Sequence, residues 1–223
     1  IKNTSILKFY ISDNNGNLNE KTVDLSHLKF TNSTNKTVSL YSALIETGGD
    51  PFRPTIQIEH ISNDSQPSLA LSSKTFKVYT YEKGEIIFTL DNNPFSTDIL
   101  KINLNDFTAD LKSIKQPEIA QHEYYANAAK SNSFLIDDKI LQIKTTPDVL
   151  FFTVSEQNGV RINQFKTLRE EEISYKNSDV YQESGSIHNK KVLEKPKQFI
   201  RKINNSSPAV TCYKLNGSYY TTI

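Results

Sequence analysis

The sequence has few of the residues that build disulfides, metal centres and phosphate-binding loops. Its 223 residues include one cysteine and four histidines, which excludes an internal disulfide and any cysteine-cluster metal site. Only seven residues are glycine, and the sequence contains no phosphate-binding loop, Gly-x-Ser-x-Gly or dinucleotide-binding motif. We therefore expect no metal and no cofactor, and no catalytic residue is assigned from a motif.

An excess of charge and long apolar runs are also missing. The chain carries 26 basic and 25 acidic residues, a formal net charge of +1, so its overall charge favours neither nucleic acid nor an anionic membrane over other partners. No apolar run approaches the ~18–20 residues that a membrane helix needs. We expect a protein or glycan ligand, no nucleic acid, and no membrane-spanning segment in this stretch.

Methionine and tryptophan are absent, and the chain begins at Ile1 and ends within the β-forming run 219–223. We expect a piece of a longer product in which residues 1–223 form a single β-rich domain. The hydrophobic fraction of 36% suits a protein of shallow strands. Residues 174–198 are charged and polar, and we expect them to form an excursion on the surface.

The clearest pattern lies in residues 76–114, FKVYTYEKGEIIFTLDNNPFSTDILKINLNDFTADLKSI. It alternates as strands do, over 76–81, 86–90, 99–104 and 109–114. Gly84 provides the positive φ that a tight first turn requires. These residues therefore predict a four-stranded antiparallel meander, close to the ~40–50 residues of one propeller blade.

Shorter patterns flank this meander. Asn158-Gly159 predicts a type I′ hairpin, and the alanine-containing run 118–130 is the best candidate for a short helix or an ordered loop. We expect strands to exceed helices several-fold. The other expected strands are 5–11, 21–25, 38–45, 55–61, 133–144, 149–155, 160–165, 168–173, 199–203 and 209–223. The expected buried core residues are Ile99, Leu104, Ile136, Leu141, Phe151, Val154 and Ile162.

The meander with Asp/Asn turns, as in ILKINLNDFTADLKSI (99–114), resembles the blades of bacterial β-propeller proteins of the cell envelope. The resemblance extends over residues 76–173 and is one of architecture. It implies an all-β fold of propeller-like antiparallel meanders in an exported protein that is periplasmic, secreted or displayed on the outer surface. A β-sandwich is the alternative, because it also has short strands with turns every 8–12 residues.

Candidate binding residues gather in one short run. His122 and Glu123 form an adjacent imidazole–carboxylate pair, followed by Tyr124 and Tyr125. Aromatic side chains beside such a pair can line a small-molecule pocket. No His-Glu-x-x-His or other metal-ligand spacing surrounds them, so we expect a ligand-binding role without a metal.

Other polar patterns are better explained by turns. The oxygen-bearing positions Asp13, Asn15 and Asn17 resemble a calcium loop but lie between two expected strands. Asp137 and Asp138 separate two apolar runs where a hairpin turn is needed. Cys212 lies in an alternating run and is expected to be a buried strand thiol.

Abundant hairpins, a nearly neutral net charge and missing catalytic motifs favour a non-catalytic binding or scaffold domain. The alternative is a carbohydrate-active hydrolase or lyase whose site is assembled from separate blade loops, because such a site leaves no linear motif. Two carboxylates ~5–10 Å apart in one pocket would favour the enzyme. A third possibility is a structural piece of a larger assembly.

Overall fold

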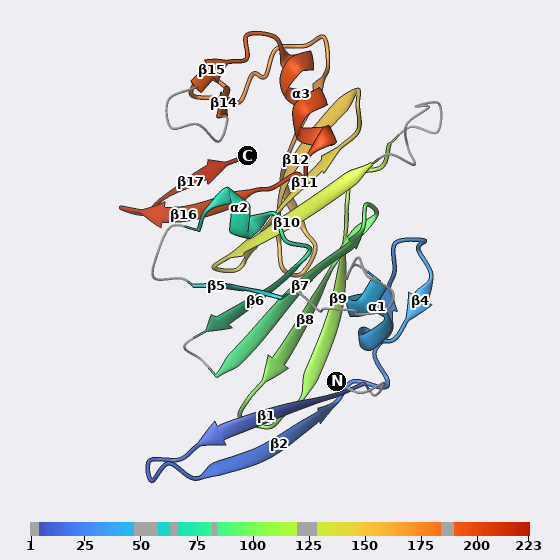
Figure 1. Ribbon diagram of the computed structural model, residues 1–223, viewed down its shortest axis with the longest axis vertical. Coiled ribbons are helices and arrows are strands. Elements are labelled where there is room, and N and C mark those ends of the chain that lie inside the picture. The colour runs from blue at the N-terminus through green and yellow to red at the C-terminus, as the bar shows by residue number, and fades with distance from the viewer. Residues whose placement is uncertain (1–4, 47–57, 63–66, 82–83, 120–128, 184–189) are drawn as a thin grey trace.

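The computed structural model describes residues 5–46, 58–62, 67–81, 84–119, 129–183 and 190–223, and within them strands greatly exceed helices (Figure 1). The expected all-β class is confirmed, with several mostly antiparallel sheets. No helix in these ranges is long and apolar enough to cross a membrane.

The larger sheet is built on the central stretch and has the strand order β5-β6-β7-β8-β9. Its strands are β5 (Glu59–Ile61), β6 (Phe76–Tyr81), β7 (Glu85–Asn93), β8 (Ser96–Asn103) and β9 (Ala109–Lys115). β6 to β9 form an antiparallel meander, and β5 pairs in parallel with β6. The meander predicted over 76–114 is therefore confirmed.

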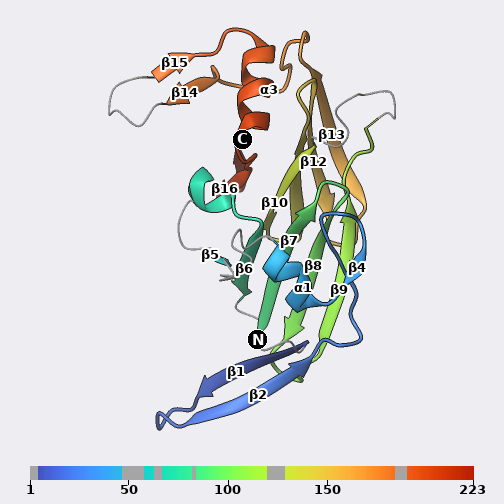
Figure 2. The ribbon, with the colours of Figure 1, turned by 45° about the vertical axis from the view of Figure 1, so that its right-hand side comes forward.

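The second sheet is another antiparallel meander, in the order β10-β11-β12-β13. Its strands are β10 (Lys130–Ile136), β11 (Lys139–Thr145), β12 (Val149–Glu156) and β13 (Arg161–Leu168). The turn between β10 and β11 is formed by Asp137, at φ +51°, and Asp138, as the sequence predicted. The second sheet is displaced from the first along the long axis of the molecule (Figures 1 and 2).

The two sheets share one hydrophobic core, and the larger sheet has a second core on its other face. The side chains of β7 alternate between the two cores. Ile87 belongs to the shared core, whereas Phe88 and Leu90 belong to the second core. Helix α1 (Leu40–Glu46) and the hairpin of β1 (Ile6–Ser12) and β2 (Leu18–Asp24) supply residues to the second core. Within the described residues these sheets form no closed ring.

Smaller elements complete the molecule. Helix α2 (Leu69–Ser72) precedes β6, and helix α3 (Pro196–Asn205) packs Ile200 and Ile203 into the shared core. The β1–β2 hairpin lies at one end of the molecule, and α3 with the β14–β15 hairpin at the other (Figures 1 and 2). The remaining two-stranded pairs are β3 (Phe30–Thr31) with β4 (Thr37–Val38), β14 (Tyr181–Glu183) with β15 (Lys190–Val192), and β16 (Thr211–Leu215) with β17 (Ser218–Thr222).

Two expected strands are helices, and the strand expected over 168–173 is absent beyond Leu168, the last residue of β13. Residues 38–45 contain most of α1, and 199–203 lie within α3. In both segments the buried residues follow a spacing of three and four, as on one face of a helix: Leu40, Ala43 and Leu44 in α1, and Ile200 and Ile203 in α3. The helix expected in 118–130 falls mostly on 120–128, outside the described residues, and residues 116–119 are not helical.

The expected core is confirmed for Ile99, Leu141 and Phe151, which are at most 5% exposed. Leu104, Ile136 and Val154 are half-buried, and for Ile162, which is 52% exposed, the prediction is wrong. The β12–β13 register shifts between Val154, paired with Asn163, and Ser155, paired with Arg161. Ile162 is therefore the unpaired residue of a bulge.

The two Asn-Gly turns differ in geometry. In the β16–β17 hairpin Asn216 and Gly217 both have positive φ, +50° and +79°, as a type I′ turn requires. In the β12–β13 connection only Gly159 has a positive φ, and its N–H donates to Glu156 O at 2.9 Å. The type I′ turn predicted for Asn158-Gly159 is therefore wrong, because four residues connect these strands instead of two.

Two glycines with positive φ form a matched pair for substitution. A Cβ at Gly217 (φ +79°) would meet nothing within 4 Å, whereas one at Gly84 (φ +71°) would lie 3.3 Å from Asn105 Nδ2. We expect Gly217→Ala to cost about 1 kcal/mol through backbone strain alone, and Gly84→Ala to cost more. Urea unfolding of both variants tests this ranking, which equal losses would contradict.

Candidate functional site: a polar cavity between the two sheets

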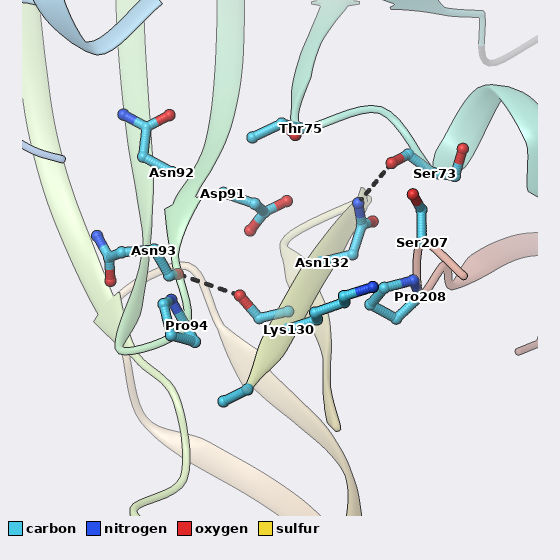
Figure 3. Close-up of a pocket in the computed structure, with 12 residues that line it drawn as sticks. Ser73, Thr75, Asp91, Asn92, Asn93, Pro94, Lys130, Asn132, Ser207 and Pro208 are labelled. Carbon is cyan, nitrogen blue, oxygen red and sulfur yellow. Dashed lines mark hydrogen bonds between the residues drawn. The ribbon is translucent and has the colours of Figure 1, made fainter. Parts of the chain in front are cut away.

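The candidate site is a cavity of about 240 Å³ at the edge of the two sheets (Figure 3). Five segments line it: the end of α2, the start of β6, the end of β7, the start of β10, and the link from α3 to β16. Its lining residues are Ser73, Thr75, Asp91, Asn92, Asn93, Pro94, Ala129, Lys130, Ser131, Asn132, Ser207 and Pro208. Most of them are polar, so the cavity is suited to a hydrogen-bonding ligand.

The end of β7 brings three consecutive polar residues, Asp91, Asn92 and Asn93, to one wall of this cavity. Asn93 Oδ1 accepts hydrogen bonds from the N–H groups of Phe95 (2.8 Å) and Ser96 (3.0 Å). These bonds fix the turn, and Ser131 Oγ donates to Asn93 O at 3.1 Å to tie it to β10. The wall is therefore held by both sheets.

A buried ion pair lies behind the cavity wall. Lys77 on β6 and Asp91 on β7 have fully buried side chains, and Lys77 Nζ lies 3.3 Å from Asp91 Oδ2. Lys77 Nζ also donates to Lys74 O (2.6 Å) and to Asn132 Oδ1 (3.2 Å). Burial lowers the pKa of Lys77, and Asp91 partly offsets that effect.

The carboxylate of Asp91 accepts four hydrogen bonds from the protein. Its Oδ1 accepts from Thr97 Oγ1 at 2.7 Å, and its Oδ2 accepts from both the N–H and the hydroxyl of Ser133 at 2.9 Å and from Lys77 Nζ at 3.3 Å. These contacts neutralise and orient the carboxylate. Asp91 is thus placed to organise the wall.

Asn132 connects this pair to the opposite rim. Its Nδ2 donates to Ser73 O and Lys74 O, both at 3.2 Å, while its Oδ1 accepts from Lys77. Figure 3 shows the amide of Asn132 directed toward Ser73. The bonds fix the end of α2 to the second sheet, so the cavity is pre-formed.

One buried acceptor in the lining has no partner within the described residues. Asn92 is only 8% exposed, and its Nδ2 donates to Thr31 O at 3.1 Å. Its Oδ1 accepts no hydrogen bond. A buried acceptor without a partner costs roughly 1–3 kcal/mol. The amide of Asn92 is held against Thr31 and its Oδ1 is buried, so this acceptor is a local cost of the fold and is not open to a ligand in the cavity.

The remaining charge at the rim comes from Lys130, whose Nζ donates to Ser206 O at 2.9 Å. Asp91 is the only carboxylate among the described lining residues, and Lys77 neutralises it. The cavity is smaller than the ~300–1,000 Å³ of drug-sized sites. It therefore fits a compact, hydroxyl-rich ligand without a positive charge.

The polar character continues into the interface between the sheets. Gln142 Nε2 donates to Thr97 Oγ1 (3.1 Å) and to Ile114 O (3.2 Å). Gln142 Oε1 accepts from Thr153 Oγ1 at 3.5 Å. Thr97 thereby links the network to Asp91, and the network couples the cavity wall to the packing of both meanders.

The predicted binding residues His122, Glu123, Tyr124 and Tyr125 lie outside the described residues. The prediction that they bind ligand is therefore neither confirmed nor contradicted. Sequence reasoning missed the cavity wall, because residues 91–94, DNNP, read only as the punctuation of a loop. A usable signal was the position of Asp91, in phase with Ile87 on a strand and therefore expected to be buried.

The other polar candidates have structural roles. Asp13 Oδ1 accepts from the N–H groups of Asn15 (2.9 Å) and Asn17 (2.8 Å), so this loop is the polar hairpin turn that was predicted. Asp137 Oδ2 accepts from Tyr219 Oη and Lys214 Nζ and holds the β16–β17 hairpin to the β10–β11 turn. Cys212 is 2% exposed in β16, as predicted. No group of three potential metal ligands occurs within the ranges that the structure describes.

Comparison with known proteins adds no relative, since no family model, curated protein or solved structure matches this chain.

Proposed function

We propose that this chain is a non-catalytic binding domain whose polar cavity holds a compact, neutral, hydroxyl-rich ligand, such as the terminal sugar unit of a glycan. The observation that carries the proposal is the lining itself, in which polar residues outnumber apolar ones around a space of about 240 Å³. Ser73, Ser131 and Ser207 place hydroxyl groups around that space, where they can bond to the hydroxyl groups of a ligand.

The chemistry of the lining favours binding over hydrolysis. A glycosidase requires two carboxylates about 5–10 Å apart, one of which must exchange a proton. Of the described lining residues only Asp91 carries a carboxylate, and Lys77, Thr97 and Ser133 occupy its oxygens. The hydrolase alternative therefore has less support than a binding domain.

Our proposal extends to fold and location. Two consecutive four-stranded meanders that share a core are what neighbouring propeller blades would form, so we propose a propeller-like unit, with the sandwich as the alternative. We also propose that the protein is exported from a bacterial cell to the periplasm, the medium or the outer surface. The resemblance of 99–114 to envelope-protein blades supports this location.

Binding to an array of neutral oligosaccharides, followed by calorimetry on each hit, tests the proposed function. We expect Ser73→Ala to weaken binding roughly tenfold, because the ligand loses a hydroxyl partner in the lining. Ser207→Phe is expected to abolish binding, because it fills the cavity from the exposed link before β16. Asn163→Ala, on the exposed side of β13, is the matched control and should bind as the wild type does.

Two results would contradict this function. If no glycan binds, or if Ser73→Ala and Ser207→Phe bind a hit as tightly as Asn163→Ala does, the cavity is not the site. If the wild type releases new reducing ends from a bound glycan, the domain is catalytic. A melting temperature measured for each variant separates loss of binding from loss of folding.

A further inference from the structure

Positive charge is concentrated at one end of the molecule. Residues 190–202 contain six basic side chains and one acidic side chain, although the whole chain has a net charge of only +1. The basic residues belong to β15, α3 and the link between these elements, which lie together at the end opposite the β1–β2 hairpin (Figures 1 and 2). We call the following set the basic end: Lys190, Lys191, Lys195, Lys197, Arg201 and Lys202.

Little within the described residues neutralises the basic end. Lys190 pairs with Glu183 at 2.9 Å, and the other five side chains form no ion pair with any described residue. All of the basic end except the half-buried Lys202 is exposed. The charges therefore face solvent and produce a positive field at this end of the molecule.

Helix stability does not explain these lysines. Lys195 occupies the N-cap of α3 without a side-chain capping bond, and no acidic residue is present in the first turn. Positive charge at a helix N-terminus is unfavourable, because the helix dipole is positive there. Lys195 and Lys197 therefore weaken the start of α3, although Lys202 lies in the last turn, where positive charge is favourable. Contact with an anionic partner would explain the two lysines at the start.

An exposed apolar pair accompanies the charges. Tyr181 on β14 and Val192 on β15 are cross-strand partners and are 51% and 42% exposed. Lys190 Nζ lies 5.7 Å from the centre of the Tyr181 ring. Tyr181, Val192 and Lys190 therefore share one face of the hairpin. A tyrosine, an aliphatic side chain and a lysine together favour the boundary between lipid headgroups and acyl chains.

We propose that the basic end, with Tyr181 and Val192, docks this protein on the anionic headgroups of a lipid membrane. Lysines near such a surface attract it, and the Tyr181–Val192 pair enters its interface. Helix α3 itself stays in the protein, because its apolar side chains Ile200 and Ile203 belong to the shared core. This is peripheral docking, and it does not depend on the ligand of the polar cavity.

A soluble polyanion is the alternative partner for the basic end, but it would not explain the exposed apolar pair of Tyr181 and Val192. Nucleic acid or an acidic polymer would use the lysines alone and would leave Tyr181 and Val192 in water. Single-stranded nucleic acid also requires several aromatic rings for base stacking, and Tyr181 is the only exposed aromatic residue among the described residues of these elements. A lipid surface uses both features.

Flotation with vesicles tests the docking. Vesicles of phosphatidylcholine alone are compared with vesicles that contain about a third phosphatidylglycerol, at low and high salt. We expect binding to the anionic vesicles only, and we expect it to weaken as salt rises. The triple variant K191E/K195E/K197E should bind at least about 100-fold more weakly, at about fivefold per lysine lost.

Two further variants distinguish lipid from other anions. K36E/K112E/K176E reverses three exposed lysines outside the basic end and should bind vesicles as the wild type does. Tyr181→Ser with Val192→Ser should weaken vesicle binding severalfold but leave any binding to polyglutamate or DNA unchanged. Docking is refuted if anionic vesicles do not float the wild type, if both triple variants bind equally, or if the Ser variant binds vesicles as tightly as the wild type does.

Discussion

Asp91→Asn is expected to lower the free energy of unfolding by about 3–5 kcal/mol, the largest loss that we expect from any substitution considered for this protein. The substitution keeps the shape of the side chain and removes its charge. Lys77 would then be a buried cation without an anion, because its other partners, Lys74 O and Asn132 Oδ1, are neutral. Its pKa, already lowered by burial, would fall further.

A double-mutant cycle isolates the ion pair from the hydrogen bonds around it. Lys77→Met alone leaves Asp91 without its counter-ion, whereas K77M/D91N removes both charges. We expect the double variant to lose less than the sum of the single losses, with a coupling energy of about 2–3 kcal/mol from urea unfolding. Additive losses would mean that Ser133 and Thr97 suffice to stabilise Asp91, and the pair would not organise the wall.

The exposed pair of Lys8 and Glu20 is the control. Its Nζ–Oε1 distance is 2.7 Å, shorter than that between Lys77 and Asp91, but both side chains are largely exposed. Glu20→Gln should therefore change stability little, because water screens and replaces the interaction. A large loss in this variant would show that the unfolding assay does not report burial.

The meanders were predictable from sequence, because the residues that determine each strand and turn are neighbours in the chain. Residues 76–114 alternate with a period of two and are interrupted where Gly84 takes a positive φ, so strand, turn and strand follow from neighbouring residues. The two helices were misread because each buries only two or three residues. In so short a segment, the apolar residues of 199–203 are too few to establish a period.

The candidate site could not be predicted in the same way. Its wall comes from β7, its rim from the end of α2 and from the link before β16, and residues as distant as Lys77 and Asn132 meet there at 3.2 Å. Only the packing of one sheet on the other creates that contact. What the sequence offers is indirect: a charged residue in phase with core residues, as Asp91 is with Ile87, requires a buried partner.

The net charge of the chain likewise does not predict the basic end. The net charge of +1 favours no anionic partner, whereas the surface has a basic end because acidic residues lie elsewhere. The net charge of the whole chain does not show this asymmetry, but a count of the charged residues in 190–202 does. Position along the chain, rather than total charge, was the useful quantity.

Lys144 provides the second large effect, and it depends on pH. Lys144 lies on β11 and is 3% exposed. Its Nζ donates to Pro117 O at 2.7 Å and lies 5.7 Å from the centre of the Phe95 ring. Burial lowers the pKa of Lys144 from 10.5 to about 8, an effect that Glu118 partly offsets. Between these two pH values the folded protein has released a proton that the unfolded chain still binds.

Because the unfolded state binds more protons in that window, the free energy of unfolding should increase as pH rises from about 8 toward 10.5. The contribution of Lys144 is at most about 3 kcal/mol, since each pKa unit corresponds to 1.36 kcal/mol.

Other groups titrate between about pH 8 and 10.5 too, so the measured quantity is the difference in the free energy of unfolding between wild type and Lys144→Met, from urea unfolding at pH 7 to 10. We expect this difference to change by about 2–3 kcal/mol, and Lys112→Met, on the exposed side of β9, to track the wild type throughout. A constant difference between wild type and Lys144→Met would mean that the buried ammonium keeps its ordinary pKa, held by Pro117 O and the Phe95 ring despite the loss of water.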